Sequence, residues 1–175
     1  SGRLVPSTTV PEADVFIIAV PTPVTPDMRA DLSYVEAAAT SIVPVLRKGN
    51  LVVLESTCPP GTTAGLLAGI LSRSGLKVGS DVLVAYCPER VLPGQILREI
   101  EGNDRIIGGL TPESAQAARD LYATFVSGEI SLTDATTAAG ETVWTPAATS
   151  PTRWENSLLP SRYTSPQRHT SPRTC

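Results

Sequence analysis

Short apolar runs alternate with longer amphipathic segments through the first 139 residues of the chain. This alternation is typical of βα units in a mainly parallel sheet, where strands are apolar throughout because helices cover both faces. We predict five extended segments, of which the first three are the most regular: residues 15–20, 51–54, 82–86, 104–109 and 129–132.

Helices are predicted between these segments. The first starts at the capping-box sequence Ser33-Tyr-Val-Glu36 and continues with apolar residues at helical spacing until Gly49, with a bend at Pro44. The second covers residues 62–74 and stops at Gly75.

A third helix begins at Thr111-Pro112, where threonine is a good N-cap and proline suits the first turn. It ends at Gly128, and one apolar stripe is formed by Ala115, Ala118, Tyr122 and Phe125. Together the elements predict an α/β protein with a partial, Rossmann-like doubly wound sheet in residues 1–139.

The character of the chain changes at Gly140. Residues 140–175 are rich in Ser, Thr, Pro and Arg, show no sustained periodicity and contain both tryptophans and His169, the one histidine. Such composition cannot bury enough apolar surface to fold, so we predict a disordered C-terminal tail. His169 is expected to be inert.

Composition excludes several function classes. The net charge is −3 and the isoelectric point is about 5.2, which gives little electrostatic support for binding nucleic acid or an anionic membrane. No apolar run approaches the length of a membrane span, so a cytoplasmic location is expected. Three widely spaced cysteines indicate free thiols and neither a disulfide framework nor a metal site.

Unusual polar loops follow the first three predicted strands. They are Pro21-Thr-Pro23, then Glu55-Ser-Thr57, then Pro88-Glu-Arg90. Ligands of open parallel sheets bind beyond the carboxyl ends of the strands, so we expect Thr22, Thr57, Glu89 and Arg90 to surround one site.

The loops also have ordinary interpretations. Pro-Thr-Pro is commonly a turn, Ser-Thr before a helix is commonly a cap, and Glu89 beside Arg90 is commonly a solvated surface pair. Cys58 and Cys87 adjoin strand ends, where a small buried thiol is the ordinary role. Residue types and spacing alone therefore lead no further than part of a nucleotide-binding-like α/β domain.

Four ordered motifs resemble the UDP-glucose/UDP-mannose dehydrogenase family. They are ADVFIIAVPTP, LVVLESTCPPGTT, YCPERVLPGQ and NDRIIGG, and the resemblance extends over residues 13–138. The form Pro-Glu-Arg-Val-Leu-Pro-Gly is most similar to the UDP-N-acetyl-D-mannosamine dehydrogenase branch, since UDP-glucose dehydrogenases more usually have Pro-Glu-Phe-Leu there.

The resemblance implies oxidation of a sugar C6 alcohol to a carboxylate, with two hydride transfers to NAD and a UDP-sugar as substrate. By position in the motifs, it implies that Thr22 and Thr57 contact NAD and that Arg90 and Val91 contact the nucleotide sugar. Glu89 matches the glutamate that assists water attacking a covalent thioester, a general-base task. Members are typically oligomers.

Parts of the family pattern are not found in these 175 residues. The glycine-rich dinucleotide fingerprint would precede Ser1, and neither Cys58 nor Cys87 occupies the Gly-Gly-His-Cys context of the catalytic nucleophile. We therefore expect a fragment that is inactive alone, with residues 140–175 disordered or translated out of frame. The alternatives are a UDP-glucose-type 6-dehydrogenase fragment, a non-catalytic nucleotide-binding module and a pseudogene product.

Overall fold

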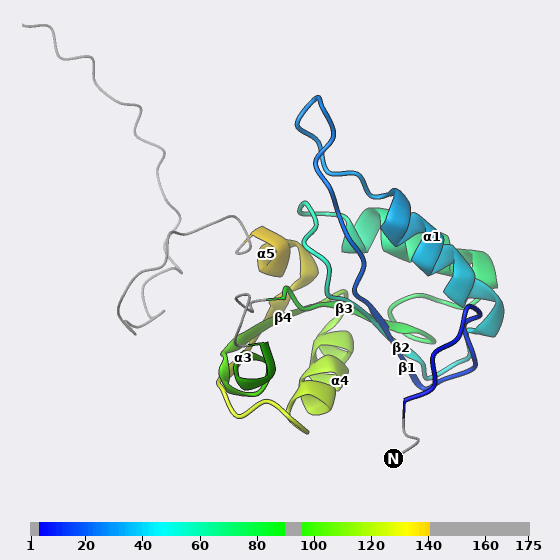
Figure 1. The fold of residues 1–175 in the computed structure, drawn as a ribbon. Helices are drawn as coiled ribbons and strands as arrows, with labels where there is room; N and C mark the ends of the chain where they lie inside the picture. Colours follow the sequence, from blue (N-terminus) through cyan, green and yellow to red (C-terminus); the bar gives the residue numbers. More distant parts are fainter. Residues whose placement is uncertain (1–3, 90–95, 141–175) are drawn as a thin grey trace, which may run out of the picture. The chain divides into compact units, whose positions relative to one another are not determined.

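The computed structural model describes residues 4–89 and 96–140 (Figure 1). Its strands are β1 (Val15–Ile18), β2 (Leu51–Leu54), β3 (Leu83–Tyr86), β4 (Arg105–Gly109) and β5 (Ile130–Asp134). Its α-helices are α1 (Ser33–Ile42), α2 (Ala68–Leu71), α3 (Ile96–Gly102), α4 (Pro112–Tyr122) and α5 (Ala135–Gly140). Short helical turns at Val43–Val45, Thr63–Leu67 and Ser72–Ser74 adjoin α1 and α2.

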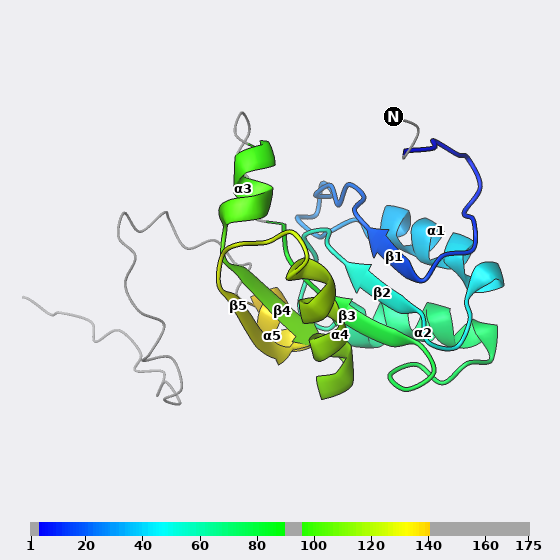
Figure 2. The same cartoon turned by 90° about the horizontal axis from the view of Figure 1, so that it is seen from below.

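The strands form one mixed sheet in the order β1-β2-β3-β4-β5 (Figure 2). β1, β2 and β3 are parallel, and β4 and β5 are parallel to each other. β4 runs antiparallel to β3, with Tyr86 opposite Gly108. The start of β4 therefore lies at the sheet edge where β1, β2 and β3 end. The predicted α/β, Rossmann-like class is confirmed, with this one reversed strand.

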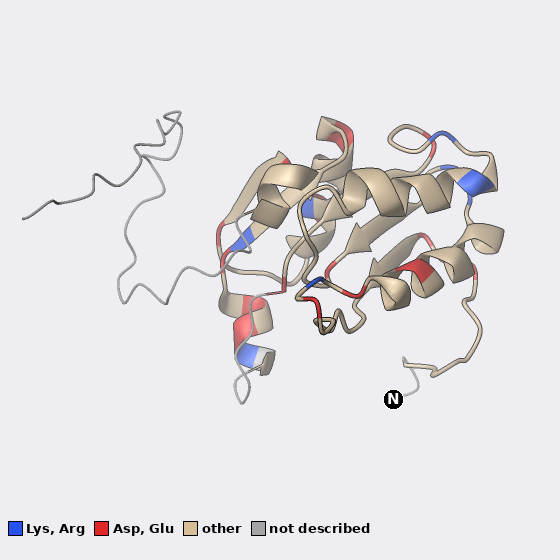
Figure 3. Cartoon of the chain, turned by 90° about the horizontal axis from the view of Figure 1, so that it is seen from above, with Lys and Arg blue, Asp and Glu red and all other residues tan. Residues whose placement is uncertain are grey.

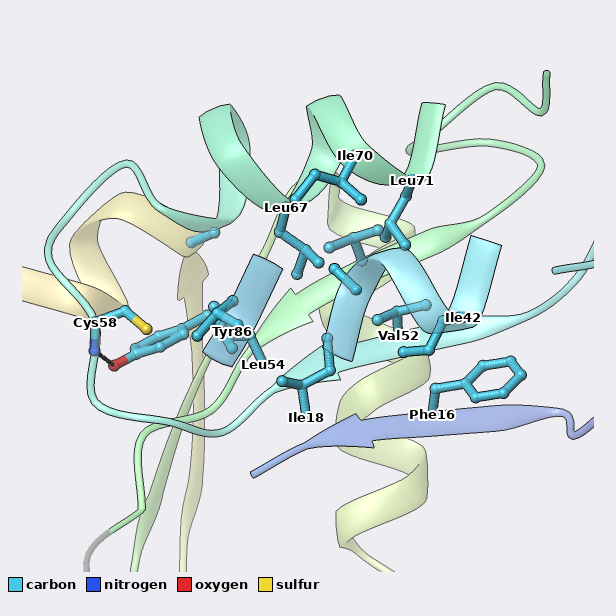
Figure 4. Close-up of a cluster of buried hydrophobic side chains, with 14 of the residues drawn as sticks. Phe16, Ile18, Ile42, Val52, Leu54, Cys58, Leu67, Ile70, Leu71 and Tyr86 are labelled. Atoms are coloured by element: carbon cyan, nitrogen blue, oxygen red, sulfur yellow. Dashed lines mark hydrogen bonds between the residues drawn. The ribbon is translucent and has the colours of Figure 1, made fainter. Parts of the chain in front are cut away.

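Both faces of the central strands are buried, as their continuous apolar sequence predicts. α1, α2 and α5 cover one face and α4 covers the other (Figure 1). Successive side chains of a strand point to opposite faces, so Val52 and Leu54 face α1 and α2 while Leu51 and Val53 face α4. Figure 4 shows the core on the α1 and α2 side of the sheet. Helical side chains pack there on strand side chains, with Leu67, Ile70 and Leu71 over Ile18, Val52, Leu54 and Tyr86.

The start of α1 differs from the prediction. Leu32 occupies the N-cap position and no side chain caps the helix, so the predicted capping box at Ser33 is wrong. The reason is local, because the Asp31 carboxylate precedes the helix and accepts a hydrogen bond from the Ser33 backbone N–H at 2.9 Å. The helix also ends earlier than predicted: α1 stops at Ile42, Pro44 lies in the 3₁₀ turn that follows, and the backbone is extended at Leu46, before the predicted end at Gly49.

The helix predicted at residues 62–74 is present, but it changes from a π-helical turn to α2 and then to a 3₁₀ turn. It ends as predicted at Gly75, whose φ of 82° is a left-handed conformation that glycine adopts without strain. Helix α3 was not predicted from the sequence.

α4 has the predicted cap, in which the Thr111 hydroxyl oxygen accepts from the Ser114 backbone N–H at 3.2 Å. The predicted apolar stripe is correct for the helical residues and wrong for Phe125, which is 41% exposed. α4 ends at Tyr122, so Phe125 lies beyond the helical repeat and its ring contacts the Tyr122 ring at 5.4 Å between centroids.

Charged residues occur on several separate elements of the described part of the chain (Figure 3). No helix within residues 4–89 or 96–140 has both the length and the apolar composition that crossing a membrane requires. The same residues include no group of three or more His, Cys, Asp and Glu side chains placed to bind a metal ion. The predicted disordered tail and His169 lie outside the described residues.

Gly108 of β4 tests the packing of α5 on the sheet. A Cβ atom here would lie 2.7 Å from both the Ala135 Cα and the Ala138 Cβ atoms and would also meet the Asp134 carbonyl oxygen. We expect Gly108→Ala to lower the free energy of unfolding by about 1–3 kcal/mol, measured by urea denaturation.

Gly69→Ala is the control, because Gly69 lies exposed in α2 with nothing within 4 Å of a Cβ. It should be neutral or stabilising by up to about 1 kcal/mol. Equal effects of the two changes would contradict the packing.

The buried cysteines give a second test. Cys58 and Cys87 are free thiols, 4% and 0% exposed, and burial raises the pKa of each to about 11. Only about one thiol in a thousand is then ionised at pH 8, and the thiolate is the reactive form. In a Cys175→Ser background, a thiol reagent at pH 8 should label both cysteines rapidly in guanidinium and only slowly without it. Fast labelling of the folded chain would contradict their burial.

Candidate functional site

The loops after β1, β2 and β3 meet at one edge of the sheet. The Thr22 hydroxyl, after β1, donates to the Thr57 carbonyl oxygen at 2.7 Å. The Glu89 backbone N–H, after β3, donates to the Glu55 carbonyl oxygen at 3.3 Å. Each pair joins neighbouring loops directly, so the three polar loops form one continuous wall.

Ser56 fixes the first two loops relative to each other. Its side chain is buried, and its hydroxyl donates to the Val20 carbonyl oxygen at 2.7 Å and accepts from the Val20 backbone N–H at 2.8 Å. The backbone N–H of Glu55 also donates to the Ile18 carbonyl oxygen at 2.9 Å. Polar backbone groups that no longer pair within the sheet are therefore satisfied by a neighbouring loop.

A pocket of about 300 Å³ lies between these loops. We call it the two-carboxylate pocket, because Glu55 and Glu89 both line it and its described lining includes no Lys or Arg. The other lining residues are Ala19, Val20, Pro21, Thr22, Ser56 and Thr57. Three of the predicted site residues, Thr22, Thr57 and Glu89, are thus brought together. Arg90 and Val91 lie outside the described residues.

A second hollow of about 500 Å³ adjoins the two-carboxylate pocket. Both threonines line it as well, together with Cys58, Pro59 and Ala139 among others. The backbone N–H of Cys58 donates to the Tyr86 hydroxyl at 3.4 Å, which ties this loop to β3 (Figure 4). Thr22 and Thr57 therefore stand between two adjoining spaces.

Glu55 makes an ion pair that the sequence analysis did not identify. Its Oε1 atom lies 3.5 Å from Nη1 of Arg105, the first residue of β4. The Arg105 side chain is 2% exposed and the Glu55 side chain is 20% exposed. Nη2 of Arg105 donates to the Ile100 carbonyl oxygen at 3.3 Å, and the guanidinium lies over the Tyr122 ring, 5.7 Å from its centroid.

Burial dominates the electrostatics of Glu55. It raises the pKa of this carboxyl, and the Arg105 guanidinium and the Tyr122 hydroxyl lower it by less, while the charge of Glu89 raises it further. The net direction is upward because the loss of solvation on burial, which disfavours the charged form, is the largest of these effects. The ion pair thus opposes protonation without preventing the upward shift.

Neither buried cysteine is suited to covalent catalysis. A nucleophilic cysteine needs a lowered pKa, and burial raises the pKa of both Cys58 and Cys87. Cys87 lies beside Arg105, whose charge opposes this effect but does not reverse it. The thiols serve as packing groups, which confirms their interpretation from sequence.

Two sequence signals could have identified the missed ion pair. Glu55 directly follows the apolar strand β2, and strand alternation places it on the same face as Leu51 and Val53. Arg105 begins the otherwise uncharged run Arg-Ile-Ile-Gly-Gly. A charged residue at the start of a buried strand requires a partner, but that partner depended on the direction of β4.

The chain is similar in sequence to several named dehydrogenases. Relatives include an NDP-N-acetyl-D-galactosaminuronic acid dehydrogenase from Ralstonia solanacearum, 56% identical over 140 residues, and the UDP-N-acetyl-D-mannosamine dehydrogenase of Escherichia coli K12, 50% identical over 144 residues. These alignments cover 75% and 78% of this chain and 33% and 34% of the relatives. The chain therefore spans about one third of the length of the curated relatives it matches.

A solved structure shows the same fold. The UDP-N-acetyl-mannosamine dehydrogenase from Staphylococcus aureus superimposes with a TM-score of 0.74 and 46% identity, covering 77% of this chain and 33% of that one. Residues 1–126 match the NAD binding domain model of the UDP-glucose/GDP-mannose dehydrogenases. That match covers well over half of the chain, so the chain belongs to the UDP-glucose/GDP-mannose dehydrogenase family.

Proposed function

We propose that this chain forms part of an NAD-dependent dehydrogenase that oxidises the C6 hydroxyl of UDP-N-acetyl-D-mannosamine to the uronate. The observation that carries the proposal is the meeting of Thr22, Thr57 and Glu89 at one pocket beyond the carboxyl ends of β1, β2 and β3. Ligands of open α/β sheets bind at this position. Membership of the family supports the same reaction class.

The residues present fit a dinucleotide. Thr22 and Thr57 line both hollows, and the Thr22–Thr57 hydrogen bond holds their loops together. In the proposed enzyme these threonines hold NAD, which accepts the hydride when bound. Rigid positioning matters because small displacements of a bound reactant cost large factors in rate.

Glu89 has the proposed role of general base. It lines the two-carboxylate pocket, where it can accept a proton from water that attacks the oxidised sugar carbon. The proposed roles of Arg90 and Val91 in binding the nucleotide sugar are kept from the sequence and concern residues outside the described part.

The second candidate substrate is an N-acetylgalactosamine nucleotide. The relative from Ralstonia solanacearum that is 56% identical is named for N-acetyl-D-galactosaminuronic acid. Both candidates are nucleotides of an acetamido sugar, so the proposal at this coarser level does not depend on the epimer.

A chimaeric enzyme tests the proposal, because the chain spans about a third of its relatives. Residues 1–140 would replace the matching segment of the Escherichia coli enzyme, which is 50% identical. We expect NADH formation with UDP-N-acetyl-D-mannosamine at a higher kcat/KM than with UDP-glucose. Glu89→Gln should lower kcat by about 100-fold or more, because it removes the base.

Glu113→Gln is the matched control, since Glu113 is exposed in the first turn of α4. It should leave turnover nearly unchanged. The N-acetylgalactosamine nucleotide is assayed as the third substrate. A folded chimaera that oxidises neither this nucleotide nor UDP-N-acetyl-D-mannosamine nor UDP-glucose would overturn the proposed reaction. An active chimaera in which Glu89→Gln keeps full turnover would overturn the role of Glu89 alone.

A further inference from the structure

The two-carboxylate pocket is rich in hydrogen-bond acceptors. The hydroxyls of Ser56 and Thr22 already donate to backbone carbonyls, and its described lining includes no cationic side chain. Glu55 is four-fifths buried, yet it still lines the pocket. A pocket with these acceptors suits a neutral group with several donors, such as the hydroxyls of a sugar ring.

The Arg105 guanidinium contributes less to stability than its burial would suggest. Its Nε atom is buried with no hydrogen-bond partner among the described residues. A buried cation that leaves a donor unpaired costs stability, so stability alone does not explain its presence. The contact that Arg105 does make is with the pocket residue Glu55, because its Nη1 atom lies 3.5 Å from the Glu55 Oε1 atom.

The sheet topology makes this anchor possible. β4 is antiparallel to β3, so its first residue lies beyond the carboxyl end of β3. Arg105 shares the α4 face of the sheet with Ile107 and reaches Glu55 from there. The guanidinium also donates a hydrogen bond to the Ile100 carbonyl oxygen, which fixes its position. The Glu55 carboxylate that pairs with it is therefore held in one orientation.

We propose that Glu55 is a ligand-binding residue of the two-carboxylate pocket, accepting a hydrogen bond from a sugar hydroxyl, and that Arg105 is its positioning residue. The hydroxyl belongs either to a ribose of the dinucleotide or to the hexose of the sugar nucleotide. The inference rests on the proposed function, whose pocket it describes in more detail. It assigns no bond-breaking step to either residue.

Separate titrations of the two ligands test the inference. In the chimaeric enzyme, the Kd of NAD alone and of UDP-N-acetyl-D-mannosamine alone are measured by calorimetry for Glu55→Gln, a nearly isosteric change. We expect the Kd of one ligand to rise by about 10-fold to 100-fold, as for loss of a hydrogen bond to a charged group. The ligand affected identifies the hydroxyl, and kcat at saturation should change much less.

The pH dependence tests the positioning role of Arg105. Four groups face Glu55: Arg105 from β4, Tyr122 from α4, and Cys87 and Glu89 after β3. Arg105 lowers the pKa of Glu55, so Arg105→Met should raise that pKa. Affinity for the affected ligand would then be lost at a higher pH as the solution is acidified. Arg105→Lys keeps the charge and should restore part of the affinity and of the original pH profile.

Matched surface changes and separate outcomes keep the inference falsifiable. Arg119→Met removes an exposed cation of α4 and should leave both Kd values and the pH profile unchanged. An active enzyme in which Glu55→Gln alters neither Kd would overturn the inference and leave the proposed function standing. Loss of stability in Arg105→Met with unchanged Kd and pH profile would show a structural role only. An enzyme without dehydrogenase activity would instead overturn the proposed function.

Discussion

The reversal of one strand determines what the site contains. β1, β2 and β3 are parallel, so their carboxyl ends and the loops that follow lie at one edge of the sheet. Because β4 is antiparallel to β3, its first residue lies at the same edge. Arg105 thereby reaches Glu55, and both pocket carboxylates belong to loops that hydrogen bonds join. A parallel β4 would place Arg105 at the far edge.

Much of the fold and part of the site could be predicted from local patterns. Apolar runs bounded by polar loops located β1, β2 and β3, because strands buried on both faces have few other sequence forms. The rule that parallel strands end at one edge then predicted that Thr22, Thr57 and Glu89 would be neighbours. The structure places these three around one pocket.

Other features depend on contacts that no local pattern specifies. The direction of β4 follows from its pairing with β3, and the short motif Arg-Ile-Ile-Gly-Gly is compatible with either direction. The Glu55–Arg105 pair joins residues fifty positions apart and could not be recognised before that direction was known. The start of α1 was predicted incorrectly because the Ser33 side chain was expected to cap the helix. In the structure the Asp31 carboxylate accepts a hydrogen bond from the Ser33 backbone N–H.

A crystal structure of the complete chimaeric dehydrogenase with NAD and UDP-N-acetyl-D-mannosamine bound is the most direct test of the central claim. The account predicts that Thr22 and Thr57 contact the dinucleotide. It also predicts a sugar hydroxyl at about 2.5–3.0 Å from a Glu55 carboxylate oxygen, the ordinary O–H···O distance. Density for both ligands at another face of the sheet, with the two-carboxylate pocket holding neither, would contradict it.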